Sequence, residues 1–432
     1  MHLTIPELYK IYRQFPFVQT DTRKLQQGDI FFALKGENFN GNLFALKALE
    51  LGAAYAVTDE DVGASDKRLI QVKDALETLQ QLAKFHREQF QTPFIAITGS
   101  NGKTTTRELV YAVLASHYKT YSTIGNLNNH IGIPLTILKI KNDAEIAVIE
   151  MGANHQMEIE GYCKIAQPTH GIISNIGKAH LEGFGGIEGV RKGKGELYDF
   201  LRAHNGTAFA FNDLDYLHDM SKGIKDVIWF GTGNGKVCGN VKAYEPFLEV
   251  AITKGASFNT IKTNLVGDYN LPNILCAVTV GKHFNVPDEK IKFSLENYIP
   301  TNSRSQLMDI GTNKIILDAY NANPTSMKAA IENFANIHAD KKILVLGGMM
   351  ELGEASINEH KKMLMLIEEY DFNEVILVGG DFEKNHGPYK YFHTSEAAAE
   401  YIQQQNFHHG YFLIKGSRSM QMEKTLNAFK VE

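Results

Sequence analysis

Short apolar runs recur along the middle of the chain, and segments with helical spacing separate them. The runs at 94–98, 146–150, 171–175, 207–211 and 227–230 have the length and composition of buried strands. Strands that alternate with helices predict a parallel sheet with crossover helices. The pattern then becomes short and glycine-rich at 231–264, where we expect a small antiparallel patch, and a helix follows at 270–283.

The same alternation returns in the last part of the chain, which predicts a second doubly wound, Rossmann-like α/β unit. The expected strands are 315–318, 343–346, 375–378 and 411–414. The expected helices are 325–336, 360–369, 395–404 and 417–429.

The first part is smaller, with strands expected at 29–34 and 54–58 and helices at 43–51 and 74–90. Thr92 and Pro93 interrupt the pattern, and 432 residues are too many for one core. We therefore expect an α/β protein of three domains, at 1–91, 92–300 and 301–432. The central domain would contain a parallel sheet with a P-loop, and the Rossmann-like domain would follow it.

Composition narrows the class of protein. Apolar residues make up 44% and charged residues 22%, as in ordinary soluble proteins, and the net charge of −5 gives no reason to expect nucleic acid. Three widely spaced cysteines indicate reduced thiols. The N-terminus lacks a basic stretch followed by a long apolar one, and no apolar run is long enough for a membrane span. We expect a cytoplasmic protein.

The segment Thr98-Gly-Ser-Asn-Gly-Lys-Thr-Thr-Thr106 lies between an expected strand and an expected helix. Free amides at a helix N-terminus and a lysine attract anions, which predicts a nucleoside triphosphate site. Only two residues separate the glycines, whereas the common P-loop has four, so a chance loop is the alternative. The residues expected to hold the nucleotide here are Gly99, Ser100, Asn101, Gly102, Lys103, Thr104 and Thr105.

Two further motifs follow strands of the same expected sheet. Glu150 ends one strand, and His180 lies in a glycine-rich loop after another. Magnesium takes hard oxygen ligands, so Glu150 and the Thr104 hydroxyl suit it. The alternatives are that Glu150 caps the next helix and that His180 is an ordinary surface residue.

Lys194 lies in the basic run Arg191-Lys-Gly-Lys194, which would normally be a solvated helix face. A lysine desolvated near other cations can instead lose its proton. The neutral amine can react with carbon dioxide, and the carbamate formed could bind a second magnesium ion.

Polar residues also mark the start of the last domain and its strand ends. Arg304 could stabilise charge on a transferring phosphoryl group or form an ordinary salt bridge at the domain joint. Asp318 could hold a ribose hydroxyl, while Asn323 and Pro324 form a turn and helix start. Lys415 and Arg418 suit a carboxylate or phosphate.

Together these motifs resemble the Mur ligase family, the ATP-dependent amide ligases of cell-wall precursor synthesis. The resemblance covers essentially the whole chain. The segments that carry it are Asp21-Thr-Arg23, Phe31-Phe-Ala-Leu-Lys-Gly36, the phosphate loop, Gly125-Asn-Leu-Asn-Asn129, Glu150-Met-Gly-Ala-Asn-His155, Asn175-Ile-Gly-Lys-Ala-His-Leu-Glu182, Tyr320-Asn-Ala-Asn-Pro324 and Lys415-Gly-Ser-Arg-Ser-Met420.

The order of motifs is most similar to that of the members that add D-alanyl-D-alanine to UDP-N-acetylmuramoyl-tripeptide through an acyl phosphate. The resemblance implies ATP and Mg²⁺, no nucleic acid and a monomer, with UDP bound by the first domain, ATP by the second and the amino substrate by the third. It implies magnesium ligands at Thr104, Glu150, His180 and carbamylated Lys194, and catalytic roles for Lys103 and Arg304. It implies nucleotide contacts from Asn270, Asn273, Arg304 and Asp318. It implies substrate contacts from Thr22, Arg23, Lys35, Gly36, Asn128, Asn129, Tyr320, Asn321, Asn323, Lys415, Ser417 and Arg418.

Four positions depart from the family pattern: His130, Met157, Tyr269 and Gly348. The nearest alternative is a ligase of the same family that adds a diamino acid to the dipeptide precursor. Its Asp-Asn-Pro-Arg motif is absent here, because Thr325 follows Asn323 and Pro324. A folylpolyglutamate synthase would not need the first domain, and a nucleotide-driven switch protein would carry an Asn-Lys-x-Asp motif.

Overall fold

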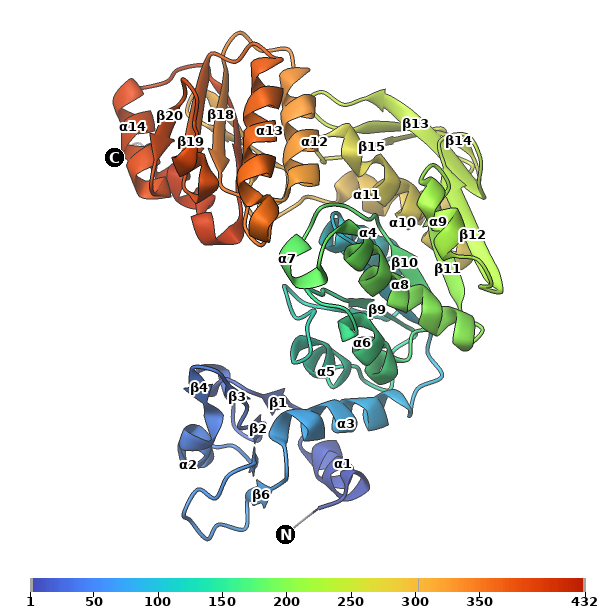
Figure 1. Ribbon diagram of the computed structural model, residues 1–432. Coiled ribbons are helices and arrows are strands. Elements are labelled where there is room, and N and C mark those ends of the chain that lie inside the picture. The colour runs from blue at the N-terminus through green and yellow to red at the C-terminus, as the bar shows by residue number, and fades with distance from the viewer. Residues whose placement is uncertain (1–2, 302, 430–432) are drawn as a thin grey trace.

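The computed structural model describes residues 3–301 and 303–429, which form three lobes along the chain (Figure 1). The lobes are built on sheets of four, nine and six strands, and a two-stranded ribbon lies in the first lobe. No helix among the described residues is long and apolar enough to cross a membrane. The structure therefore has the predicted mixed α/β class with parallel sheets.

The first lobe has four parallel strands in the order β1-β2-β5-β6. Its elements are α1 (Ile5–Gln14), β1 (Val18–Gln19), β2 (Ile30–Phe32), β3 (Lys35–Gly36), β4 (Phe39–Asn40), α2 (Ala45–Glu50), β5 (Tyr55–Thr58), β6 (Leu69–Gln71) and α3 (Ala75–Arg87). Helix α1 was not predicted, although Thr4 and Glu7 form a capping box at its start and Leu8 and Tyr12 supply a buried face.

The central sheet has the order β15-β14-β13-β12-β11-β10-β7-β9-β8. Its strands are β7 (Phe94–Thr98), β8 (Thr120–Ser122), β9 (Ile146–Glu150), β10 (His170–Ile173), β11 (Thr207–Phe211), β12 (Asp226–Gly231), β13 (Val237–Ala243), β14 (Glu249–Lys254) and β15 (Thr260–Lys262). The seven strands from β7 to β13 pair in parallel. Strand β14 pairs antiparallel with both β13 and β15, which gives the predicted antiparallel patch. Since β7 lies between β9 and β10, the carboxyl ends of these three strands meet at one edge.

Helices cover this sheet and join it to the first lobe. They are α4 (Lys103–Ala115), α5 (Gly132–Ile137), α6 (Glu158–Ala166), α7 (Leu181–Phe184), α8 (Ile187–Ala203), α9 (Asp215–Met220), α10 (Leu271–His283) and α11 (Asp288–Asn297). Helix α4 packs against α10, and α3 packs against α5 and α6. One apolar cluster therefore runs from α1 and α3 into the central sheet. The division of the chain at residues 91 and 300 stays a prediction.

The last sheet has the order β16-β17-β21-β18-β19-β20, with β16 antiparallel at one edge and the other pairs parallel. Its elements are β16 (Gln306–Ile310), β17 (Asn313–Asp318), α12 (Pro324–Ala335), β18 (Lys342–Gly347), α13 (Ser356–Glu368), β19 (Glu374–Val378), β20 (Lys390–Phe392), α14 (Ser395–Gln405) and β21 (Tyr411–Lys415). The strand β16 was not predicted.

The expected helix at 417–429 is wrong. Ser417 is extended, Gln421 has a left-handed backbone (φ 49°), and two 3₁₀ segments follow at Arg418–Met420 and Met422–Phe429. Met422 is fully buried against the backbone of Gly347 and Gly416. This packing, which a periodicity pattern does not report, replaces a regular helix.

Candidate active site

The phosphate loop turns between β7 and α4, and two glycines allow the turn. Gly99 and Gly102 have positive φ values of 136° and 76°. A β-carbon on Gly99 would lie 2.1 Å from Ser174 Oγ, and one on Gly102 would lie 2.9 Å from Asn273 Oδ1. The sequence signal of two glycines therefore reflects both the backbone angles and the close approach of neighbouring segments.

The Lys103 ammonium is held inside this loop. Its Nζ donates hydrogen bonds to the carbonyl oxygens of Gly99 (2.6 Å) and Ser100 (3.0 Å). Burial lowers the pKa of Lys103 to about 8; Glu150 opposes this shift and Arg304 adds to it. An anion that enters the loop would stabilise the charged form, so the loop is suited to a polyphosphate.

Glu150, at the end of β9, is 1% exposed and has both carboxylate oxygens engaged. Its Oε1 accepts hydrogen bonds from Thr104 Oγ1 (3.0 Å) and Asn128 Nδ2 (2.8 Å), and its Oε2 accepts one from Arg107 Nε (3.1 Å). The next helix, α6, begins only at Glu158, so the interpretation of Glu150 as its cap is wrong.

The donor set suits a magnesium ion that also binds phosphate. A hydroxyl and a carboxylate oxygen lie 3.0 Å apart at Thr104 and Glu150. No group of three or more His, Cys, Asp or Glu residues that could hold a metal occurs in the described part of the chain. Magnesium usually takes one or two carboxylates together with phosphates and water, and the pair of Thr104 and Glu150 suits such an ion.

His180 and Lys194 occupy two different environments near the loop. His180 has a left-handed backbone (φ 53°), and its Nδ1 lies 2.5 Å from Oε2 of Glu351, a residue of the last lobe.

Lys194 is 1% exposed on α8, so the interpretation of this lysine as part of a solvated helix face is wrong. Its Nζ donates to the Ala153 carbonyl (2.8 Å) and lies 4.9 Å from the centre of the Phe184 ring. Burial holds the pKa of Lys194 well below its usual value; Lys103 adds to this, and Glu158 and Glu196 oppose it.

A cavity of about 660 Å³ lies between the central and last lobes, and most of the predicted site residues line it. From the central lobe these are Ser100, Asn101, Gly102, Lys103, Thr104, Thr105, Asn128, Asn129, Glu150, His180, Asn270 and Asn273. From the last lobe and its joint they are Arg304, Asp318, Tyr320, Asn321, Asn323 and Lys415.

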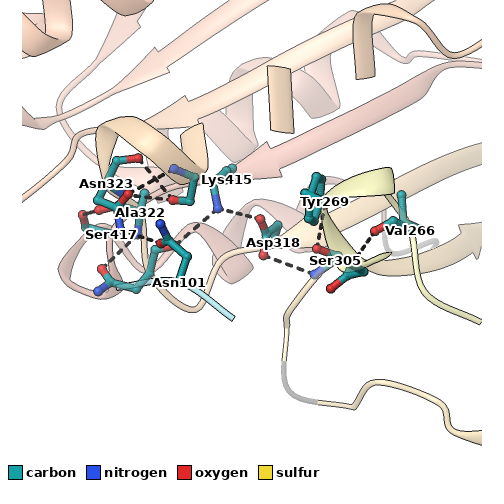
Figure 2. A network of polar contacts seen from close by, with 12 residues as sticks. Asn101, Val266, Tyr269, Ser305, Asp318, Ala322, Asn323, Lys415 and Ser417 are labelled. Atoms are coloured by element: carbon teal, nitrogen blue, oxygen red, sulfur yellow. Dashed lines mark hydrogen bonds and ion pairs between the residues drawn. The ribbon is translucent and has the colours of Figure 1, made fainter. Parts of the chain in front are cut away.

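The side of the cavity formed by the last lobe carries a polar network (Figure 2). Lys415, which is 2% exposed, donates to Asp318 Oδ2 (2.5 Å), and the Ser305 amide donates to Asp318 Oδ1 (3.2 Å). The Arg304 guanidinium lies 3.7 Å from the centre of the Tyr320 ring. Arg304 thus stacks on the aromatic face of Tyr320 and lines the cavity.

The segment with Asn270 and Asn273, which the resemblance predicts to contact the nucleotide, packs directly on the phosphate-loop helix. Asn270 Nδ2 donates to the Val266 carbonyl (2.8 Å), and Asn273 Nδ2 donates to Asn270 Oδ1 (2.9 Å). Thr106 Oγ1, on α4, donates to Asn273 Oδ1 (3.0 Å). These bonds place both asparagines at the cavity wall next to the loop.

Eight predicted residues do not line the cavity: Gly99, Lys194, Thr22, Arg23, Lys35, Gly36, Ser417 and Arg418. Arg23 pairs with Asp21 (2.8 Å) and Lys35 pairs with Glu60, both on the surface of the first lobe. Ser417 Oγ donates to the Ala322 carbonyl (3.2 Å) and accepts from the Met350 amide (2.9 Å), a buried structural position.

Direct contacts join the two lobes that form the cavity. Asn323 Nδ2 donates to Asn101 Oδ1 (2.7 Å), and the Lys178 ammonium pairs with Glu359 (2.7 Å). Sequence reasoning missed Arg107, Glu359 and the His180 partner Glu351. The sequence carries no signal for these three residues, because their burial and their partners are set only by the fold.

The comparisons with known proteins agree along the whole chain. Residues 97–281 match the Mur ligase middle domain, residues 303–418 match the "Mur ligase, glutamate ligase domain", and residues 14–87 match the "Mur ligase family, catalytic domain". The UDP-N-acetylmuramoyl-tripeptide–D-alanyl-D-alanine ligase of Bacillus subtilis is 37% identical over 84% of this chain and 79% of its own length. The enzyme of that name from Escherichia coli is 32% identical over 96% and 93%.

Solved structures agree with this result. MurF from Acinetobacter baumannii superposes with a TM-score of 0.87 at 31% identity, covering 95% of this chain and 92% of the other. MurF ligase from Thermotoga maritima in complex with ADP has a TM-score of 0.86 at 27% identity and 96% coverage of both chains. A folylpolyglutamate synthase from Mycobacterium tuberculosis, at 13% identity and a TM-score of 0.62, is similar in fold alone.

Proposed function

The chain belongs to the Mur ligase family, and we propose from this premise that it joins D-alanyl-D-alanine to UDP-N-acetylmuramoyl-tripeptide at the expense of ATP. The observation that carries the proposal is the cavity between two lobes. It combines a phosphate loop, a buried carboxylate and polar residues of the last lobe. Relatives named for this activity match most of the chain, and the reaction would complete the UDP-muramoyl-pentapeptide precursor of peptidoglycan.

The proposed chemistry explains why a nucleotide site and an amine site share one cavity. A carboxylate is a poor acyl donor because oxide would have to leave. Transfer of the γ-phosphoryl group of ATP to this carboxylate gives an acyl phosphate and ADP. The amine of D-alanyl-D-alanine then attacks the acyl carbon, phosphate leaves, and the amine loses a proton as the amide forms.

Side chains on both walls of the cavity would stabilise the phosphoryl transfer. Lys103, fixed by two loop carbonyls, would face the β- and γ-phosphates, and Arg304 would approach from the domain joint. Thr104, Glu150 and His180, which line the same cavity, would hold Mg²⁺. The ion, when bound, neutralises phosphate charge.

We propose the remaining assignments on the family pattern. Thr22, Arg23, Lys35 and Gly36 would bind the UDP end on the first lobe, and Asn128 and Asn129 the muramoyl peptide. The amino substrate would be bound by residues of the last lobe: Tyr320, Asn321, Asn323, Lys415, Ser417 and Arg418. Lys415 would act indirectly by holding Asp318, and Ser417 by holding the loops that contain Ala322 and Met350. The enzyme would work as a monomer in the cytoplasm.

Lys194 is proposed to carry a carbamate. Burial holds the pKa of Lys194 well below its usual value, which favours the neutral amine; this amine would attack carbon dioxide, forming an N–C bond with release of a proton. We expect ¹³C-labelled bicarbonate to give a carbamate carbonyl resonance in the parent protein and none in Lys194→Arg. Lys192, on the same helix, is the control, because it is exposed and Lys192→Arg should keep the resonance. The same spectrum in Lys194→Arg and the parent would contradict the assignment.

The reaction itself is tested by mass spectrometry of the product. Purified protein with ATP, Mg²⁺, UDP-N-acetylmuramoyl-tripeptide and D-alanyl-D-alanine should give the pentapeptide precursor, ADP and phosphate in equal amounts. A parallel reaction with the dipeptide precursor and a diamino acid tests the nearest alternative. Product only in that second reaction would replace the proposed function with the alternative.

A further inference from the structure

Arg107 is a buried charge, one turn beyond the phosphate loop on α4. It is 6% exposed, and its three guanidinium nitrogens are all bonded. Nε donates to Glu150 Oε2 (3.1 Å), Nη2 donates to Glu108 Oε1 (2.9 Å), and Nη1 donates to the Thr123 carbonyl. A planar guanidinium fixed at three corners has one orientation, so it can fix the carboxylate that it contacts.

The two oxygens of Glu150 face different partners. Oε2 is taken by Arg107, whereas Oε1 meets Thr104 and Asn128 at the cavity wall. The pairing thus turns one oxygen towards the phosphate loop and keeps the other away from it. The Thr123 hydroxyl accepts a bond from the Glu150 amide (3.0 Å), and the Thr123 carbonyl accepts from Arg107. Thr123 therefore holds the backbone of Glu150 directly and holds its side chain through Arg107.

The support of Arg107 extends to the joint with the last lobe. Glu108, which binds Arg107 through Oε1, accepts a hydrogen bond from the Tyr298 hydroxyl through Oε2. Tyr298 directly follows α11, at the beginning of the segment that leads to Arg304. Glu108 thus holds the guanidinium at a second nitrogen, and Tyr298 holds Glu108.

We propose that Arg107 is a positioning residue that presents Oε1 of Glu150 to the divalent cation of the bound nucleotide. This inference rests on the proposed use of ATP with Mg²⁺ at the phosphate loop. Groups that orient a metal ligand typically change metal affinity or activity by about 10- to 100-fold when they are replaced. Lysine keeps the charge of Arg107 but cannot fill all three corners, so Arg107→Lys separates orientation from charge.

The test measures cation-dependent nucleotide binding in the absence of the other substrates. A non-hydrolysable ATP analogue is titrated by calorimetry, and free Mn²⁺ is followed by electron paramagnetic resonance. We expect Arg107→Lys and Arg107→Met to raise the Mn²⁺ concentration for half-saturation at least about tenfold. Tyr298→Phe should raise it less, because it removes one support of Glu108.

Arg87→Met is the matched control. Arg87 is also 6% exposed and has three bonded nitrogens, but its partners are the backbone carbonyls of Ala166, Phe90 and Gln167. We expect it to lower the unfolding temperature without changing the Mn²⁺ requirement. Thermal unfolding of each variant shows whether it is folded. If Arg107→Met does not fold, Arg107→Lys provides the measurement of the Mn²⁺ requirement.

The outcomes distinguish this inference from the proposed function. If the parent protein shows no cation-dependent nucleotide binding, the proposed function fails first. If the parent binds and Arg107→Lys binds with an unchanged Mn²⁺ requirement, the positioning role is overturned. Tighter Mn²⁺ binding by Arg107→Met would also overturn it, because Arg107 would then act only as an opposing charge.

Discussion

Replacing Lys103 by alanine is expected to lower the rate of ligation by at least about a hundredfold, which corresponds to about 3 kcal/mol of lost transition-state stabilisation. The Lys103 ammonium is the charge that the loop fixes with two carbonyl bonds, beside the place where γ-phosphate charge would develop. Release of ADP and phosphate, measured with both substrates present, reports the loss.

The control for this variant is a lysine on the same part of the fold. Lys290 Nζ donates a hydrogen bond to the carbonyl of Ser116 (2.9 Å), and Ser116 is the C-cap of α4. Lys290 therefore lies at the C-terminal end of α4, whereas Lys103 is the first residue of this helix. Lys290→Ala should ligate at the parent rate. Lys103→Ala should still bind the UDP precursor, because the proposed contacts of UDP lie on the first lobe. Ligation near the parent rate in Lys103→Ala would remove Lys103 from the mechanism.

The edge of the central sheet could be predicted because its signals are local. Strands β7, β9 and β11 begin and end at the expected residues, and the polar residues after β7, β9 and β10 do meet at one cavity. A parallel sheet brings the carboxyl ends of its strands together, so the position of Glu150 near Lys103 follows from strand order. The family resemblance, which the comparisons confirm, named further residues that line the cavity, among them Asn128, Asn270 and Asn323.

Other features could not be predicted because they depend on contacts between distant segments. Arg107 looked like one more charge on a helix, and only the fold places Glu150 Oε2 against it. Glu351 contacts His180 from another lobe. Glu351 lies in a loop and has a left-handed backbone (φ 61°), which hydrophobic periodicity does not predict. Similarly, the buried packing of Met422 on two glycines ends the regular helix that the apolar pattern of 417–429 indicated.

The ion pair of Lys415 and Asp318 is expected to give the largest effect on stability. The side chain of Lys415 is 2% exposed and that of Asp318 is 15% exposed. Lys415 Nζ lies 2.5 Å from Asp318 Oδ2 (Figure 2). Asp318→Asn would leave a buried ammonium without its counter-charge, and breaking such a pair costs about 3–5 kcal/mol. Urea unfolding of the whole protein, followed by circular dichroism, measures this loss.

Two further variants provide the comparisons for Asp318→Asn: one breaks an exposed ion pair elsewhere, and one also removes the charge of Lys415. Glu423→Gln breaks an exposed pair with Arg418, whose side chain is 66% exposed, and should cost less than about 1 kcal/mol. Adding Lys415→Met to Asp318→Asn removes the stranded charge and should recover much of the lost free energy of unfolding, because both partners are then neutral. If Asp318→Asn alone were as stable as the parent, Lys415 would need another buried counter-charge, and Asp318 would be free to bind a ribose hydroxyl without a structural role.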